Sequence, residues 1–262
     1  MDLLVKNDEV RMVEIAERFH ILYQMTQAML NGDIRAMIVS GPPGVGKSFI
    51  VESELEKASL FNQIAGRKIT HTIVKGNATA IGLYKTLYEY SDENSVIVFD
   101  DCDSILGDDV SLNLLKGALD SGKKRRISWL SESRVLRQEA IPTSFNFKGS
   151  AIFITNIKFD NVRSAKLKDH LAALQSRCHY IDLTLDTVHD KILRIRQISR
   201  TGELFSNFGF NQEGQDDIVD FMGESQHSLR EISLRMAIKL TELRKSFPEN
   251  WKHVAKSTCM QH

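Results

Sequence analysis

The first two thirds of the chain alternate between short apolar runs and longer segments in which apolar residues recur every three or four positions. Such runs are typical of strands buried on both faces, and the longer spacing is typical of amphipathic helices. We predict strands at residues 36–40, 69–74, 95–100, 151–155 and 180–183, and helices at about 10–30, 49–60, 78–90, 110–119 and 165–174. Because strands alternate with helices, the pattern predicts an α/β fold with a five-stranded parallel sheet flanked by helices.

The strand pattern stops near residue 184. The remaining chain has only helical patterns, at about residues 187–203, 214–223 and 228–246. We therefore predict two domains, an αβα core at residues 1–184 that includes the N-terminal helix, and a small all-helical domain at residues 185–262.

A glycine-rich segment separates the first predicted strand from the next predicted helix. It consists of Gly41, Pro42, Pro43, Gly44, Val45, Gly46, Lys47 and Ser48, and it fits the phosphate-loop pattern G-x-x-x-x-G-K-[ST]. In that pattern backbone N–H groups surround a phosphate, the lysine reaches the β- and γ-phosphate oxygens, and the hydroxyl binds Mg²⁺. The alternative is a glycine-rich turn that fits by chance. The strand before it and the helix after it favour a site for ATP and Mg²⁺.

Two carboxylates follow the third apolar run. Asp100 ends the predicted strand and Asp101 comes directly after it. Ligands of parallel sheets bind at the carboxyl ends of the strands, so Asp100 is a candidate Mg²⁺ ligand and Asp101 a candidate base that orients or deprotonates the attacking water. The alternative is an acidic turn that caps the next helix, a role that Asp103 would also suit.

The order of these motifs resembles the AAA+ superfamily of ATPases, a group of phosphate-loop NTPases. The resemblance covers nearly the whole chain: GPPGVGKS, the acidic strand VIVFDD, a strand ending in FITN, an arginine in LQSRC, and an arginine in HSLRE. It implies a helical lid after the core, and ATP hydrolysis at the interfaces of a ring, expected to be a hexamer of this chain. It also implies that Asn156 is the sensor 1 residue, Arg177 the arginine finger and Arg230 the sensor 2 arginine.

For each of these three residues, the chemistry of the side chain also supports the assigned role without reference to the family. Asn156 ends a strand and can hydrogen-bond the attacking water, although a turn-forming asparagine is the alternative. A guanidinium such as that of Arg177 stabilises transition-state charge, although it can instead complement a helix dipole. We place Arg230 in the first turn of the last predicted helix, where a cation is unfavourable unless an anion lies nearby; the alternative is a surface arginine.

Two departures from the family pattern bear on activity. Asp101 stands where the family usually has glutamate, and its shorter side chain predicts slow hydrolysis. Residues 75–79 lack the aromatic-hydrophobic pair with which protein-unfolding members grip polypeptide. Residues 176–178 are similar to the Ser-Arg-Cys motif of clamp-loader subunits, but too few residues follow Phe247 for a collar domain. The chain also looks like compact ATPases encoded by bacteriophages.

The substrate is left open by the sequence. Lys123, Lys124, Arg125 and Arg126 form the densest basic cluster, and Trp129 follows them. These residues are candidates for binding a DNA backbone and stacking on a base, whereas the alternative is a solvated turn with a core tryptophan. Remodelling of an unknown protein partner and an ATP-operated assembly scaffold that hydrolyses slowly are the other functions considered.

Composition narrows the range of functions. The 34 basic and 34 acidic residues give a net charge of +0, so DNA binding would have to be local. We find no apolar stretch of membrane-spanning length and no secretory signal, so we expect no membrane partner and a cytoplasmic location, the host cytoplasm if the chain is phage-encoded. Three scattered cysteines, Cys102, Cys178 and Cys259, predict neither a disulfide framework nor a zinc site.

Overall fold

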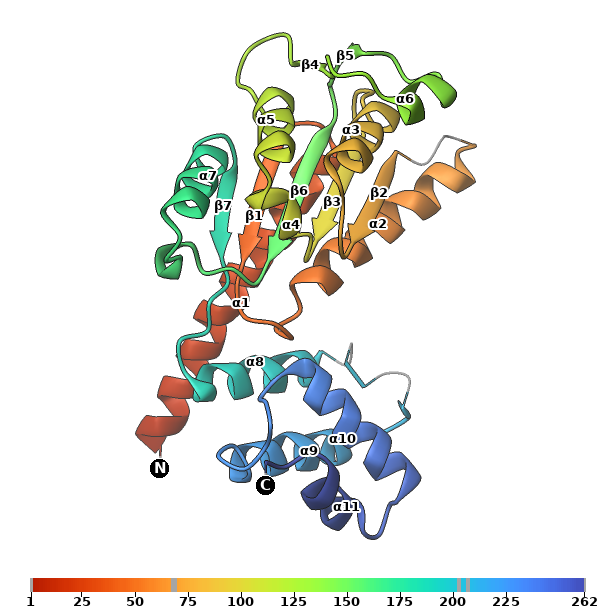
Figure 1. Cartoon of the computed structure of the whole chain (residues 1–262). Helices are drawn as coiled ribbons and strands as arrows, with labels where there is room; N and C mark the ends of the chain where they lie inside the picture. The colour runs from red at the N-terminus through yellow and green to blue at the C-terminus, as the bar shows by residue number, and fades with distance from the viewer. Residues whose placement is uncertain (1, 67–69, 202–203, 206–207, 262) are drawn as a thin grey trace. The chain divides into compact units, whose positions relative to one another are not determined.

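The computed structural model describes residues 2–66, 70–201, 204–205 and 208–261. Its main feature is a five-stranded parallel sheet in the order β2-β3-β6-β1-β7 (Figure 1). The strands are β1 (Ala36–Ser40), β2 (His71–Lys75), β3 (Val96–Asp100), β6 (Ser150–Thr155) and β7 (His179–Asp182). The predicted α/β fold is confirmed. Position 69, where we expected the second strand to begin, lies outside the described residues.

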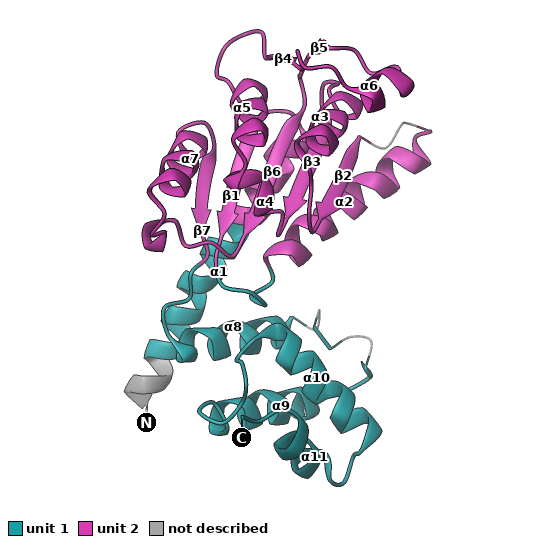
Figure 2. Cartoon of the chain, viewed as in Figure 1, with its two compact units in different colours: residues 1–20, 42–46, 184–262 teal, residues 21–41, 47–183 magenta. Residues whose placement is uncertain are grey.

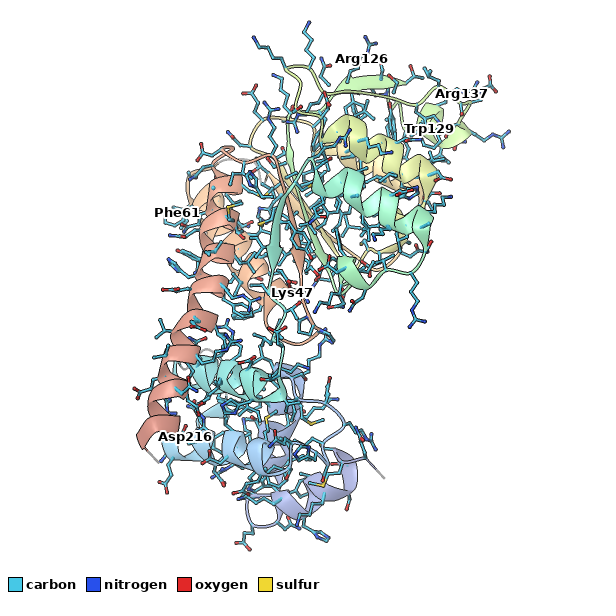
Figure 3. All side chains as sticks on the ribbon, turned by 90° about the vertical axis from the view of Figure 1, so that its left-hand side faces the viewer. Lys47, Phe61, Arg126, Trp129, Arg137 and Asp216 are labelled. Carbon is cyan, nitrogen blue, oxygen red and sulfur yellow. The ribbon has the colours of Figure 1, made fainter. Side chains whose placement is uncertain are left out.

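Helices cover both faces of this sheet (Figures 1 and 3). Alternate strand residues such as Ile38, Phe99 and Phe153 form one core cluster with the helices of the first face. These helices are α3 (Ala80–Glu89), α4 (Ser104–Gly107), α5 (Asp109–Ala118) and α7 (Ala165–Gln175). On the other face lie α2 (Lys47–Ile64) and residues 21–30 of α1 (Asp2–Leu30). Burial on both faces explains why β1, β3 and β6 read as continuous apolar runs.

The register aligns the carboxyl ends of the strands. Ser40 is opposite Thr155 of β6 and Asp182 of β7, while Asp100 is opposite Lys75 of β2. Polar residues at these ends therefore meet at one edge of the sheet. The residues that precede β1 and β7 lie at the opposite edge.

The chain divides into two compact units (Figure 2). Unit 1 comprises residues 1–20, 42–46 and 184–262, and unit 2 comprises residues 21–41 and 47–183. A single cut near residue 184 does not reproduce this division, because the first part of α1 and the loop at 42–46 group with the C-terminal helices.

Unit 1 is helical. Its C-terminal helices are α8 (Val188–Arg200), α9 (Gln212–Glu224), α10 (Leu234–Ser246) and α11 (Trp251–Thr258). Their core includes Phe205, Met222 and Trp251. Arg11 of α1 binds Asp190 of α8 with an N–O distance of 2.8 Å. None of the described helices is both long enough and apolar enough to cross a membrane.

Several elements were not predicted from the sequence. They are α4, α6 (Arg134–Gln138), α11, the 3-10 helix Phe159–Asn161, and an antiparallel hairpin of β4 (Arg126–Ser128) and β5 (Ser144–Asn146). The predicted helix at 228–246 starts later, at Leu234, because Ser233 caps it by accepting a hydrogen bond from the N–H of Met236. The predicted helix at 187–203 ends at Arg200, and its last two positions lie outside the described residues.

Candidate functional site

The glycine-rich loop connects β1 to α2, as its motif requires. Gly44 and Gly46 have φ angles of 72° and 102°, which side-chain-bearing residues rarely adopt. A Cβ on Gly44 would lie 2.6 Å from the Cβ of Ser233, and one on Gly46 would lie 3.3 Å from a methyl of Leu234. The backbone conformation therefore favours glycine at both positions, and the space beside Ser233 excludes a side chain at Gly44 as well. The Gly44 carbonyl accepts a hydrogen bond of 2.8 Å from the N–H of Leu234, within unit 1.

Lys47 begins α2 and is only 5% exposed. Its ammonium donates to the carbonyl of Gly41 at 2.7 Å and to Oδ1 of Asn156 at 2.9 Å. Because the ammonium is buried at the end of β1, it can donate only to acceptors that lie beside that strand end. A phosphate oxygen is an anionic acceptor that would replace neutral oxygens and form a stronger hydrogen bond.

Ser48 and Asp100 form the second contact of the site. The Ser48 hydroxyl donates to Oδ1 of Asp100 at 2.9 Å, and Asp100 is 6% exposed. Burial raises the pKa of Asp100, the hydrogen bond from Ser48 opposes that rise, and the charge of Asp101 adds to it. A hydroxyl and a carboxylate side by side are suitable Mg²⁺ ligands. The described residues hold no cluster of three or more histidine, cysteine or acidic side chains suited to a metal, so water and phosphate would complete the shell.

Asn156 joins the phosphate-loop lysine to the second carboxylate. Its Oδ1 accepts from Lys47, and its Nδ2 donates to Oδ1 of Asp101 at 2.8 Å. Asp101 has a φ of 53°, and its N–H donates to the carbonyl of Ile154 at 3.0 Å. Left-handed backbone is uncommon outside glycine and often marks functional sites. The structure thus brings together Lys47, Ser48, Asp100, Asp101 and Asn156 as the sequence predicts.

Sequence reasoning missed two polar neighbours of this group. Lys75, which pairs with Asp100 in register, binds Oε1 of Glu52 at 2.6 Å and lies 3.8 Å from Oδ2 of Asp100. Thr155 donates to Asp103 at 2.7 Å, and burial raises the pKa of Asp103. Both Lys75 and Thr155 end parallel strands, which is the sequence signal that could have identified them.

Arg177 lies apart from this group, within the same unit. It precedes β7 at the amino edge of the sheet, is exposed, and donates to the Ala173 carbonyl at 2.6 Å. Lys47 follows the carboxyl end of β1, so the length of a five-residue strand, roughly 15 Å, separates the two edges. Arg177 therefore does not reach Lys47 of its own chain.

The structure corrects the position of Arg230. This residue lies before α10 rather than in its first turn, because Leu229 forms an isolated bridge with Met260. The Arg230 side chain donates from Nε to the Met260 carbonyl at 3.1 Å. The arginine in the first turn of α10 is Arg235, which is exposed and follows the Leu234 that contacts Gly44. The tripeptide Ser-Leu-Arg occurs at both 228–230 and 233–235, so the sequence alone did not show which of the two arginines lies in the first turn of the helix.

Comparison with known proteins identifies the family. A model described as "ATPase family associated with various cellular activities (AAA)" matches residues 37–167, half of the chain. A relative from Enterobacteria phage T4, an uncharacterized 36.7 kDa protein in the nrdC-mobD intergenic region, is 34% identical over 243 residues, which cover 92% of this chain and 73% of the relative. The chain belongs to the AAA family of ATPases.

Two solved archaeal structures share the AAA fold. The Aeropyrum pernix ORC1 protein, in complex with DNA, matches with a TM-score of 0.52 and 13% identity over 92% of this chain and 64% of that chain. The ADP form of the Aeropyrum pernix ORC2 protein matches with a TM-score of 0.50 and 16% identity over 90% and 67%. This chain thus spans less than two thirds of the ORC1 chain. At these identities the likeness concerns the fold.

The basic cluster of this AAA protein is smaller than the sequence suggests. Arg125 is 7% exposed, donates to the Ala118 carbonyl at 3.0 Å and lies over the Phe147 ring. It is therefore excluded as a surface contact for DNA. Trp129 is half-buried and its ring centroid lies 5.7 Å from that of Tyr84, which supports the core alternative. Lys123, Lys124 and Arg126 are exposed, and Figure 3 shows Arg126 at the end of the unit opposite to Lys47.

The raised pKa of Asp100 gives a stability prediction. The folded protein binds this proton more tightly than the unfolded chain, so stability falls as the pH rises through the raised pKa. Asp100→Asn removes the buried charge and should raise the melting temperature at pH 7.5 by about 2–4 °C, the shift expected from roughly 1 kcal/mol.

Differential scanning fluorimetry without nucleotide measures this effect. The difference from wild type should shrink as the pH falls below about 4, where the carboxylate becomes protonated in both states. Asp169→Asn, at an exposed carboxylate of α7, is the matched control and should change little. An unchanged or lower melting temperature for Asp100→Asn at pH 7.5 would contradict the prediction.

Proposed function

We propose that this AAA protein binds Mg-ATP at the carboxyl edge of its sheet and hydrolyses it at the interfaces of a homo-oligomeric ring, expected to be a hexamer, that acts on DNA. The observation that carries the proposal is the continuous hydrogen-bonded set around the phosphate-loop lysine. Lys47 contacts Asn156, and Asn156 contacts Asp101. One polar network thereby links a phosphate-binding cation to a candidate base for water.

The phosphate loop has defined tasks in this proposal. The N–H groups of Gly44, Val45 and Gly46 and the ammonium of Lys47 bind phosphate oxygens, whereas Pro42 and Pro43 have no N–H to donate. Ser48 and Asp100 bind Mg²⁺, and their distance of 2.9 Å suits adjacent ligand positions. Bound Mg²⁺ would supply charge neutralisation for the phosphates.

Asp101 and Asn156 position the attacking water. The carboxylate of Asp101 is exposed and held by the amide of Asn156, so it is available to accept a proton from water at its second oxygen. Its side chain is one methylene shorter than the glutamate usual in the family, so the water must approach closer to the backbone. This geometry favours a slow turnover.

The position of Arg177 supports a ring. An exposed arginine at the edge opposite to its own phosphate-loop lysine is suited to contact nucleotide bound by another copy. Such a contact is head to tail, and head-to-tail contacts close into rings when the rotation allows.

We assign the role of the nucleotide-binding arginine of the C-terminal helices to Arg235 in place of Arg230. A cation in the first turn of α10 is unfavourable to the helix dipole unless an anion lies nearby. Arg235→Ala should weaken nucleotide affinity about tenfold, the loss expected for one charge-assisted hydrogen bond, whereas Arg230→Ala should leave affinity unchanged. Titration with a fluorescent ATP analogue measures both. Weakened binding in Arg230→Ala alone would return the role to Arg230.

DNA is the proposed substrate for two reasons. Lys123, Lys124 and Arg126 are exposed cations on one turn and strand, suited to a phosphate backbone. The ORC1 protein, whose fold this chain shares, was solved in complex with DNA.

Steady-state ATPase assays with single-stranded DNA, double-stranded DNA or neither test this function, with oligomer size measured by ultracentrifugation. DNA-stimulated turnover by an assembled species is the expected result. Assembly on ATP with no turnover would instead indicate the scaffold function, and stimulation by a protein partner alone would indicate protein remodelling.

A further inference from the structure

A polar cavity of about 480 Å³ lies at the amino edge of the sheet in unit 2. It is lined by residues that precede or begin β1 and β7, and by the turn after α5. Among them are Arg35, Arg177 and His179, together with the acids Asp33 and Asp120. Two guanidinium groups from separate strand starts therefore face one space.

Neither guanidinium is neutralised by an ion pair among the described residues. Arg35 is exposed and donates only to the carbonyls of Ser121 at 3.3 Å and Gly122 at 3.4 Å. Arg177 donates to the Ala173 carbonyl and to the Ser176 hydroxyl at 3.3 Å. All of these acceptors are uncharged, so both cations keep their full charge for an incoming anion.

A third cation lies near Arg35. Burial and the charge of Arg35 together lower the pKa of Arg125 to about 10. The like charges thus lie close enough to repel one another. Exposed Lys123 and Lys124 belong to the same turn.

The opposite edge of the sheet carries the phosphate loop and several acids. β3 and β7 end in Asp100 and Asp182, and Asp101 and Asp103 follow β3, while Lys75 ends β2 at the same edge. Because all five strands are parallel, Arg35 and Arg177 lie at one edge of each copy and the phosphate loop lies at the other. This arrangement suits head-to-tail association, in which the arginines of one copy approach the phosphate loop of the next.

We propose that Arg35 is a second cation that acts between copies: Arg35 and Arg177 of one copy together bind phosphate oxygens of the nucleotide held by the phosphate loop of the next. The proposal rests on the function proposed above. A convergent pair in one cavity suits a compact oligophosphate, whereas DNA-binding cations are distributed along a groove.

Arg35→Ala tests the proposal. We expect unchanged affinity for a fluorescent ATP analogue at low protein concentration, where copies are separate. We also expect kcat to fall roughly 10- to 100-fold, as for the loss of a hydrogen bond to a charged group. Arg35→Lys should recover part of the loss because it keeps the charge but not the fork geometry. Arg134→Ala, at an exposed arginine outside the cavity, should have no effect.

Mixing variants shows whether the effect crosses between copies. Lys47→Ala subunits are expected to bind nucleotide weakly and not to turn it over, but they carry an intact Arg35, whereas Arg35→Ala subunits bind nucleotide normally. A mixture should therefore turn over ATP faster than the sum of its parts. No recovery on mixing, or loss of nucleotide affinity in Arg35→Ala with native circular dichroism, would overturn the proposal.

Further outcomes distinguish a failure of the role of Arg35 from a failure of the proposed function. Normal turnover in Arg35→Ala with impaired turnover in Arg177→Ala would overturn the role of Arg35 alone, and normal turnover in both would overturn catalysis between copies as well. Reduced affinity for a labelled DNA duplex with normal DNA-free turnover would show that the cavity binds DNA and would also overturn it.

Discussion

Lys47→Ala is expected to weaken the affinity for Mg-ATP by about 100-fold or more and to abolish ATP turnover. The ammonium is buried, and it donates to the neutral oxygens of the Gly41 carbonyl and the Asn156 side chain. Each charge-assisted hydrogen bond to phosphate contributes about 1.5–3 kcal/mol, and alanine removes the two that the lysine would make to the β- and γ-phosphate oxygens. Isothermal titration calorimetry measures the affinity, and phosphate release measures the turnover.

The control for this experiment lies on the same helix. Lys57 of α2 binds Glu54 at 2.7 Å and is 60% exposed, so Lys57→Ala should leave affinity and turnover unchanged. Lys47→Ala also leaves two acceptors without this donor and should lower stability by about 1–2 kcal/mol, which a thermal melt detects. Wild-type affinity in a folded Lys47→Ala protein would remove the phosphate loop from the proposed function.

The sheet was predictable because each central strand is buried on both faces. β1, β3 and β6 each contain four consecutive apolar residues, which are stable only when both faces of the strand are buried. The observed bounds of these strands differ from the expected ones by at most one residue. The start of α10 was not predictable in the same way. Apolar spacing continues through Leu229 and Ile232, but the pairing of Leu229 with Met260 and the Ser233 cap separate that segment from the helix.

The candidate site was predictable where local sequence dictates position. Lys47, Ser48, Asp100, Asp101 and Asn156 each follow directly from a strand end or a glycine loop, and parallel strands bring such ends together. Residues whose position depends on long-range packing were misjudged. Arg125 occurs in a run of four cations, yet its stem and guanidinium are buried against Phe147, which the charge pattern cannot reveal.

Arg177→Ala should leave nucleotide affinity unchanged and reduce kcat by about 10³-fold, the lower end of the effect of an arginine supplied between subunits. The reason is its position at the edge opposite to Lys47, from which the proposed head-to-tail contact would bring it to the nucleotide of another copy. Turnover per subunit of the wild-type protein should accordingly rise with protein concentration as interfaces form, and the rise should be absent in the variant.

Arg137→Ala is the matched control, because Arg137 is an exposed arginine of α6 that pairs with Glu132 at 3.1 Å and lies outside the cavity. It should behave as wild type in both affinity and turnover. Turnover that is independent of concentration, together with normal kcat in Arg177→Ala, would mean that each copy completes its own reaction chamber. Contacts between the two sheet edges would then serve assembly alone, since a ring held by those edges could form without any residue crossing to the neighbouring nucleotide.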